Sequence, residues 1–124
     1  MKRLAIIFTA AMLGPVSCET GPAVAENPQK LSGTQIRAKF AGMQLTDEVH
    51  WRYVYGRDGT LRSYSMGTKK FGKWTVEKDE LCLYLNELDD GCYEVSRAGD
   101  RIELKPSGLG TTLEGILQTS ADRN

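Results

Sequence analysis

The spacing of apolar residues along the chain changes from a helical period to the two-residue period of strands, and the helical part comes first. Ile36 and Phe40 lie four residues apart and would share one face of a helix. Ser32 and Gln35 have the types and spacing of a capping box, which satisfies free backbone N–H groups at a helix start. The pattern therefore predicts one short helix at about residues 33–41.

Beyond this helix the apolar residues alternate with polar ones, which is typical of strands, from about residue 49 to about residue 118. Asp58-Gly59 is a strong signal for a two-residue hairpin turn. With these two residues as the turn, Tyr53 would face Tyr64 on the partner strand. This register would gather the aromatic residues of both strands on one face of the sheet.

A second pair of predicted strands carries two of the three cysteines. If Cys82 faces Cys92 in an antiparallel pair, Leu81 faces Tyr93, and the cysteines lie on the face away from the leucines. Directly opposed residues are close enough for a disulfide, and a cysteine pair in a small exported domain is most simply one. Two free thiols or a metal site are the alternatives, but the single histidine and the absence of a CxxC spacing disfavour metal.

Short strands joined by short turns predict an all-β fold. The expected architecture is a small antiparallel meander of about seven strands with one short N-terminal helix, closed as a barrel or packed as a sandwich. We favour the barrel, because an open meander of this size leaves two strand edges unpaired.

The N-terminal residues have the layout of a secretory signal peptide. Two basic residues precede the apolar run Leu4–Leu13, and Ala23-Val24-Ala25 supplies the small residues of a cleavage site. We predict a signal peptide at residues 1–25 and a single β-barrel-like domain at residues 26–124, located in the periplasm or secreted.

Cys18 offers a second export route. Val16-Ser17-Cys18 resembles the end of a bacterial lipobox, in which the cysteine is acylated, although Pro15 stands where a leucine is usual. Lipidation would make the protein a membrane-anchored lipoprotein. Removal or acylation of Cys18 leaves the same pair of cysteines in the mature chain.

Composition and charge exclude some classes of protein. The 124 residues include 16 basic and 16 acidic side chains, and this balance argues against a protein that coats nucleic acid. No run of about 20 apolar residues occurs, so we expect no transmembrane span in the mature form.

Several short motifs together resemble a group of small exported domains of proteobacteria. The motifs are Leu31-Ser32-Gly33 with Ile36, then Trp51, Asp58-Gly59 and Gly72-Lys73-Trp74, and finally Leu81-Cys82 and Gly91-Cys92-Tyr93-Glu94-Val95. The resemblance implies an exported domain with a helix, an Asp-Gly hairpin, a Gly-x-Trp strand, and Leu-Cys and Cys-Tyr strands. The group has no assigned activity, so the resemblance implies no functional residues.

Motifs for catalysis are sparse. His50 is the single histidine, so a hydrolase, the third and least favoured alternative, would have to build its catalytic group around it. The sequence contains no Gly-x-Ser-x-Gly elbow, no phosphate-binding glycine loop and no EF-hand spacing. We therefore expect a protein that is not an enzyme and that uses no metal or cofactor.

Aromatic residues form the first candidate site. If they line the mouth of a barrel, they offer a surface for a small apolar or sugar-like ligand, and a small-ligand carrier is one hypothesis. If they fill the interior instead, they stabilise the fold. The candidate ligand-lining residues are Trp51, Tyr53, Tyr64 and Trp74.

The charge distribution supplies the second candidate site. Residues 49–75 hold six basic residues and one acid, and residues 76–94 hold seven acids and one base. Pairing between these segments across the sheet is one interpretation. The other is a binding domain whose basic patch contacts an unknown protein or envelope component. The candidate partner-binding residues are Arg57, Arg62, Lys69, Lys70 and Lys73.

Overall fold

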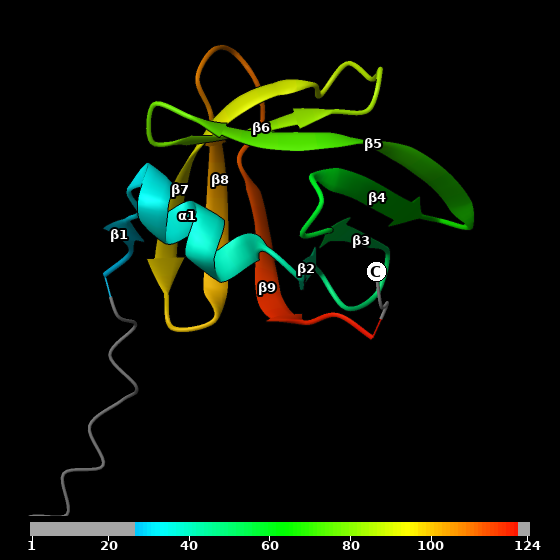
Figure 1. Ribbon diagram of the computed structural model, residues 1–124, viewed down its shortest axis with the longest axis horizontal. Coiled ribbons are helices and arrows are strands. Elements are labelled where there is room, and N and C mark those ends of the chain that lie inside the picture. The colour runs from blue at the N-terminus through cyan, green and yellow to red at the C-terminus, as the bar shows by residue number, and fades with distance from the viewer. Residues whose placement is uncertain (1–26, 122–124) are drawn as a thin grey trace, which may run out of the picture.

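The computed structural model describes residues 27–121, so the predicted signal peptide and Cys18 lie outside the described residues. One helix and nine strands occur within this range (Figure 1). In chain order they are β1 (Gln29–Lys30), α1 (Gly33–Phe40), β2 (Met43–Thr46), β3 (Trp51–Tyr55), β4 (Thr60–Ser65), β5 (Thr68–Glu77), β6 (Glu80–Tyr84), β7 (Gly91–Ala98), β8 (Arg101–Pro106) and β9 (Leu113–Thr119).

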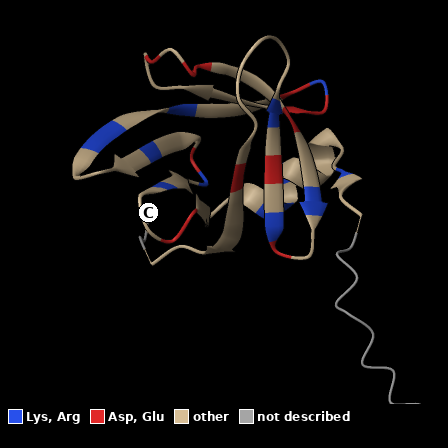
Figure 2. Ribbon diagram, turned by 180° about the vertical axis from the view of Figure 1, so that it is seen from behind, with Lys and Arg blue, Asp and Glu red and all other residues tan. Residues whose placement is uncertain are grey.

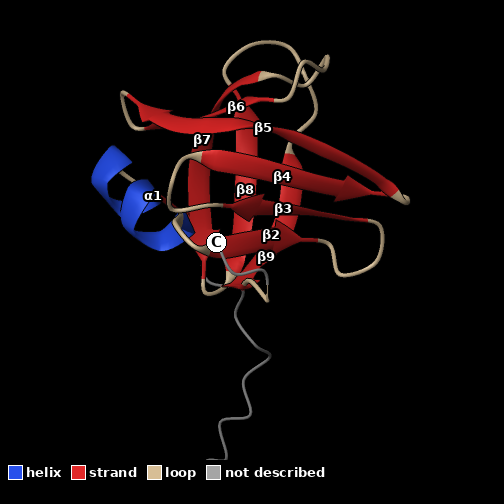
Figure 3. Cartoon of the chain, turned by 45° about the vertical axis from the view of Figure 1, so that its right-hand side comes forward, coloured by secondary structure: helices blue, strands red, loops and turns tan. Residues whose placement is uncertain are grey.

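The strands form a closed antiparallel barrel, which confirms the predicted fold class. The sheet runs from β7 through β6, β5, β4, β3, β2 and β9 to β8, and β8 pairs again with β7. Strand β1 pairs with β7 as an additional strand outside the closed ring. Figure 3 shows the strands wrapping around a common interior with α1 at one side. Closure leaves no free edge on the eight barrel strands, which removes a site of unwanted strand pairing.

Two strands lie outside the predicted strand region. Strand β1 has two residues, and β2 has four residues directly after the helix. Strand β2 pairs with β3 on one side and β9 on the other, so it is the strand that completes the ring. A segment this short shows too few alternating positions to be distinguished from a loop, and its long-range partners stabilise it as a strand.

Helix α1 begins as predicted and packs against the barrel interior. The Ser32 side chain accepts a hydrogen bond from the Gln35 backbone N–H, and the Gln35 side chain accepts one from the Ser32 backbone N–H. Ile36 and Phe40 are fully buried, and the Phe40 ring lies edge-on to Tyr55 at a centroid distance of 5.0 Å. The helix is too short to be stable alone, so its place depends on these contacts.

The hairpin of β3 and β4 has a register that differs by one residue from the expected register. Tyr53 lies opposite Ser63, and Tyr64 lies opposite Arg52. The loop is longer than two residues: the Gly59 N–H donates to Gly56 O at 3.0 Å, and Gly59 has a φ of 90°. This is the three-residue loop in which a left-handed glycine follows a type I turn. The predicted pairing of Tyr53 with Tyr64 was wrong.

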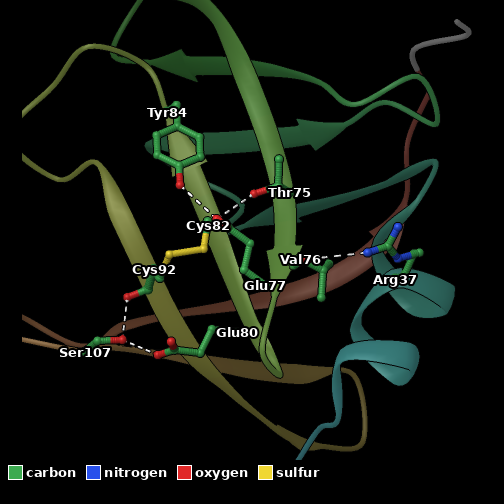
Figure 4. Close-up of a disulfide and its surroundings, with 9 residues drawn as sticks. All are labelled: Arg37, Thr75, Val76, Glu77, Glu80, Cys82, Tyr84, Cys92 and Ser107. Atoms are coloured by element: carbon green, nitrogen blue, oxygen red, sulfur yellow. Dashed lines mark hydrogen bonds between the residues drawn. A yellow bond between two sulfur atoms is a disulfide. The ribbon is translucent and has the colours of Figure 1, made fainter.

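The pairing of the cysteine strands is confirmed. Cys82 lies opposite Cys92, Leu81 lies opposite Tyr93, and a disulfide joins the two cysteines (Figure 4). The bond bridges β6 and β7 on the outer face of the barrel, while the leucines of β6 fill the core.

Candidate functional site

Basic and aromatic side chains alternate with core residues on β3, β4 and β5 and share the outer face of these strands. Arg52 lies opposite Tyr64, which lies opposite Lys69 on the next strand. Arg62 lies opposite Phe71 in the neighbouring row. We name this surface the basic–aromatic face. It consists of Arg52, Arg62, Tyr64, Lys69, Phe71 and Lys73. Figure 2 shows basic residues along these strands and acidic residues on the loop between β6 and β7.

Cations and rings are stacked on the basic–aromatic face. The guanidinium carbon of Arg52 lies 3.9 Å from the centre of the Tyr64 ring. The Lys69 ammonium lies 5.5 Å from the centre of Tyr64 and 5.1 Å from that of Phe71. Such contacts hold long side chains in place and are each worth about 0.5–1 kcal/mol at exposed sites. Phe71 is nevertheless 62% exposed, which is unusual for a large apolar ring.

The structure brings together three of the five predicted partner-binding residues. Arg62, Lys69 and Lys73 belong to the basic–aromatic face. Lys70 points to the other side of β5, because successive side chains of a strand alternate between its two faces. Its ammonium forms an ion pair of 2.6 Å with Glu87. Arg57 lies in the turn between β3 and β4 and is exposed.

The structure does not bring all four predicted ligand-lining residues to one site, although Trp51 and Tyr64 both line an open pocket beside the loop between β2 and β3. Tyr64 lies on the outer face. Trp74 is buried in the core, where its indole N–H donates to Gly56 O at 2.8 Å. Trp51 is half-buried and packs against Tyr53 at a centroid distance of 5.3 Å. Of the four, Tyr53 is the one that lines the cavity at the loop end of the barrel.

Arg52, Tyr64 and Phe71 belong to the basic–aromatic face although the sequence did not place them in a basic site. The sequence pattern includes Arg52 in the basic segment, and the expected register places Tyr64 on the opposite side of the sheet. Phe71 and Lys73 follow Lys69 at every second position of β5. Because alternate residues of a strand share a face, the sequence alone predicts that these three side chains lie together. The correct register of the hairpin was needed to add the residues of β3 and β4.

His50 lies in the loop between β2 and β3, beside Asp47. The Asp47 carboxylate accepts hydrogen bonds from the backbone N–H groups of residues 49–51 and lies 2.9 Å from the His50 ring. Although desolvation acts to raise it, the hydrogen bonds from the Trp51, His50 and Val49 N–H groups hold the pKa of Asp47 well below its usual range. This arrangement closes a turn in the manner of an Asx motif.

The surroundings of the disulfide contain another carboxylate. Glu77 accepts hydrogen bonds from the Thr75 hydroxyl at 3.2 Å and the Tyr84 hydroxyl at 3.0 Å (Figure 4). Among residues 27–121, Glu77, Cys82 and Cys92 form the one group of three with metal-ligand atoms close together. Cysteine binds metals as a thiolate, and the oxidised pair offers no thiolate.

Comparison with known proteins does not place the chain in a family: no family model, no curated protein and no solved structure matches it. In the described range, no helix has the length and apolar character needed to cross a membrane. The disulfide is compatible with an extracellular or periplasmic location, since such bonds persist in oxidising compartments.

Proposed function

We propose that the protein is an exported, non-catalytic binding domain that docks an acidic surface of another protein on its basic–aromatic face. The observation that carries this proposal is the arrangement of four cations around two rings on one side of β3, β4 and β5. No member of this face is acidic. A partner that presents carboxylates between apolar groups would match it in both charge and polarity.

The residue types of the face favour a protein as the partner. Arginine, tyrosine, phenylalanine and methionine are enriched at protein interfaces, and arginine and tyrosine often carry much of the binding energy. Met66, at the turn that joins β4 and β5, is 77% exposed and extends the apolar part of the face. Among residues 27–121, no carboxylate lies within ion-pair distance of Lys69 or Lys73. These two lysines are therefore available to pair with acids of a partner.

The barrel gives this face a rigid support. Strands β4 and β5 pair over six residues, and their inward-facing residues include Leu61 and Trp74 of the core. A binding surface on paired strands loses little conformational freedom when a partner binds. The disulfide adds covalent stability suited to an exported domain.

A charge-reversal variant with a matched control tests the proposal. K69E/K73E changes two cations of the face, and R101E/K105E makes the same change in net charge on β8, which lies across the barrel. Capture from envelope extract, read by mass spectrometry, identifies the proteins bound by the wild type. The proposal expects one of these to be retained by R101E/K105E and lost by K69E/K73E.

The purified partner then allows a direct measurement. We expect K69E/K73E to weaken its affinity at least about tenfold, and raising NaCl from 50 to 300 mM to weaken wild-type binding, because salt screens exposed charges. Equal capture by both variants would refute the proposal. Binding of the wild type to vesicles of anionic lipid, with no protein captured through the face, would assign the face to a membrane and also overturn it.

A further inference from the structure

An open pocket of about 300 Å³ lies beside the basic–aromatic face, between the β2–β3 loop and the β4–β5 turn. Its lining includes three residues of that face, which are Arg52, Tyr64 and Lys69. The Met66 N–H donates a hydrogen bond of 3.1 Å to His50 O and thereby joins the turn to the loop. The Asp47 carboxylate holds the loop by accepting hydrogen bonds from three successive backbone N–H groups. The pocket is therefore formed before a partner binds, which limits the conformational freedom lost on binding.

Neither the turn nor the core favours a methionine at position 66, which lines this pocket. Met66 and Gly67 form a two-residue turn between the paired residues Ser65 and Thr68, with φ angles of 50° and 83°. Positive φ at both positions is typical of a type I′ turn, which favours Asn, Asp or Gly and disfavours a bulky side chain. Because Met66 is 77% exposed, burial does not compensate for this preference. An exposed apolar residue in a disfavoured conformation points to contact with another molecule.

The opposite side of the pocket is also apolar. Val49 in the β2–β3 loop is 78% exposed and lines the pocket together with the half-buried Trp51. The thioether of Met66 and the indole of Trp51 both make favourable contacts with aromatic rings. A volume of about 300 Å³ is at the lower end of the range for binding pockets, so it suits one large side chain. These features favour an aromatic side chain as the occupant.

Positive charge extends from the pocket along the basic–aromatic face. Lys69 lines the pocket, and Lys73 lies four residues further on the same face of β5, which is about 13 Å along the strand. Glu48 is the one acid among the described lining residues, and Arg52 and Lys69 outnumber it. An extended chain with one residue in the pocket can thus continue over both lysines.

We propose that the pocket receives one aromatic side chain of the partner protein and that acidic residues next to it in the partner chain pair with Lys69 and Lys73. The inference rests on the proposed function, because it uses the same face and specifies the segment of the partner that the face recognises. The aromatic ring packs between Val49 and Met66. The acidic residues lie along β5 outside the pocket.

Three short peptides test the chemistry of this segment by calorimetric titration of the purified wild-type protein. The first is acetyl-Phe-Glu-Glu-Glu-Glu-amide, the second replaces its phenylalanine with serine, and the third replaces its glutamates with glutamines. We expect the first peptide to bind most tightly and the other two to bind at least about fivefold more weakly, because each lacks one of the two interactions. No binding of the first peptide at millimolar concentration, or equal binding of the serine peptide, would overturn the proposal.

The variant Met66→Asn separates binding from folding. Asparagine suits the type I′ turn, so the unfolding temperature should rise by about 2–5 °C. The same variant should bind the phenylalanine peptide at least about fivefold more weakly and the serine peptide as the wild type does. Leu109→Asn is the matched control, since Leu109 is fully exposed in the β8–β9 loop and does not line the pocket, and it should bind both peptides normally. A fall in the unfolding temperature of Met66→Asn with unchanged peptide binding would assign Met66 a purely structural role and overturn the proposal.

The outcomes separate this inference from the proposed function. A protein that is captured through the face and binds Met66→Asn as tightly as the wild type would refute the pocket and leave the proposed function standing. Retention of every captured protein by K69E/K73E would refute the proposed function and this inference with it. Single-stranded DNA also combines rings with negative charge, so hexathymidylate is titrated as well. Tighter binding of hexathymidylate than of the phenylalanine peptide would assign the pocket to nucleic acid and overturn both.

Discussion

The Arg52 guanidinium lies over the Tyr64 ring, with its central carbon 3.9 Å from the ring centre. The two residues are directly opposed on β3 and β4, on the outside of the barrel. Their contact depends on the three-residue loop at Gly56–Thr60, since a two-residue turn would place Tyr64 opposite Tyr53 instead. One residue in a turn thus decides whether this aromatic ring contributes to the interior or to the basic–aromatic face.

A double-mutant cycle measures this contact. Arg52→Met, Tyr64→Leu and the double variant should give a coupling free energy of about 0.5–1 kcal/mol in urea unfolding, because the pair is only partly buried and lies on the outer face of the barrel. The cycle removes the separate effect of losing the hydrogen bond from Arg52 to Gln44. A coupling of zero would mean that the stack does not stabilise the hairpin.

Gly72 marks the closest approach between β5 and the strand that follows it. A Cβ atom at this position would lie 1.9 Å from the Tyr84 carbonyl oxygen and 2.9 Å from a Leu85 methyl carbon. Gly72→Ala therefore requires the backbone of one strand to move. We expect a loss of about 2–4 kcal/mol in the free energy of unfolding, or failure to fold.

Gly108→Ala is the matched control for this substitution. Gly108 lies in the loop between β8 and β9, and nothing lies within 4 Å of the position of an added Cβ. Its free energy of unfolding should stay within about 0.5 kcal/mol of the wild type. Equal stability of the two alanine variants in urea would contradict the packing argument for Gly72.

The disulfide should stabilise the barrel appreciably. Cys82 and Cys92 are separated by 10 positions, and closing a loop of this length contributes about 2–3 kcal/mol in the chain-entropy description. The variant C82A/C92A should lose that amount in urea unfolding. Reduction of the wild-type protein should add the mass of two hydrogen atoms, and a purified protein that shows two free thiols without reduction would refute the bond.

Asp47 should make stability depend on acid pH. Its usual pKa of 3.8 applies to the unfolded chain, and the folded value is lower. A group with a depressed folded pKa contributes stability above its unfolded pKa, and this contribution is lost as the pH falls through the folded value. Asp47→Asn should therefore be less stable than the wild type at pH 7, and the difference should shrink below about pH 4.

Urea unfolding at several pH values between 2 and 7 checks this expectation. Asp58→Asn is a useful comparison, since hydrogen bonds from Thr60 lower the pKa of Asp58 in a different turn. A stability difference for Asp47→Asn that is the same at pH 3 and pH 7 would show that the charge of Asp47 contributes nothing.

Much of the local structure could be predicted from the sequence. The capping box of Ser32 and Gln35 operates within one turn of helix, and it is present as expected. The pairing of Cys82 with Cys92 also followed from alternation and from a short connection between the strands. In these cases the residues that decide the structure lie within about ten positions of each other.

The candidate sites were harder to predict, because they combine strands whose relative register must be correct. Lys70 is adjacent to Lys69 in sequence, but its side chain forms an ion pair with Glu87 in the loop between β6 and β7. Strand β2 shows almost no alternation of its own, and it is a strand because β3 and β9 both pair with it. No local feature of Val49 predicts that it lines a pocket with Met66, since the two residues lie in separate connections.

The amino-acid sequence by itself determined where the helix starts, which cysteines meet and that strands build the domain, because neighbouring residues carry these signals. The tertiary structure decided that the ring closes through β2, that Tyr64 joins the outer face and that a pocket lies between the β2–β3 loop and the β4–β5 turn. The physical reason is the two-residue period of a strand: a one-residue change in a turn moves every following side chain to the other face of the sheet.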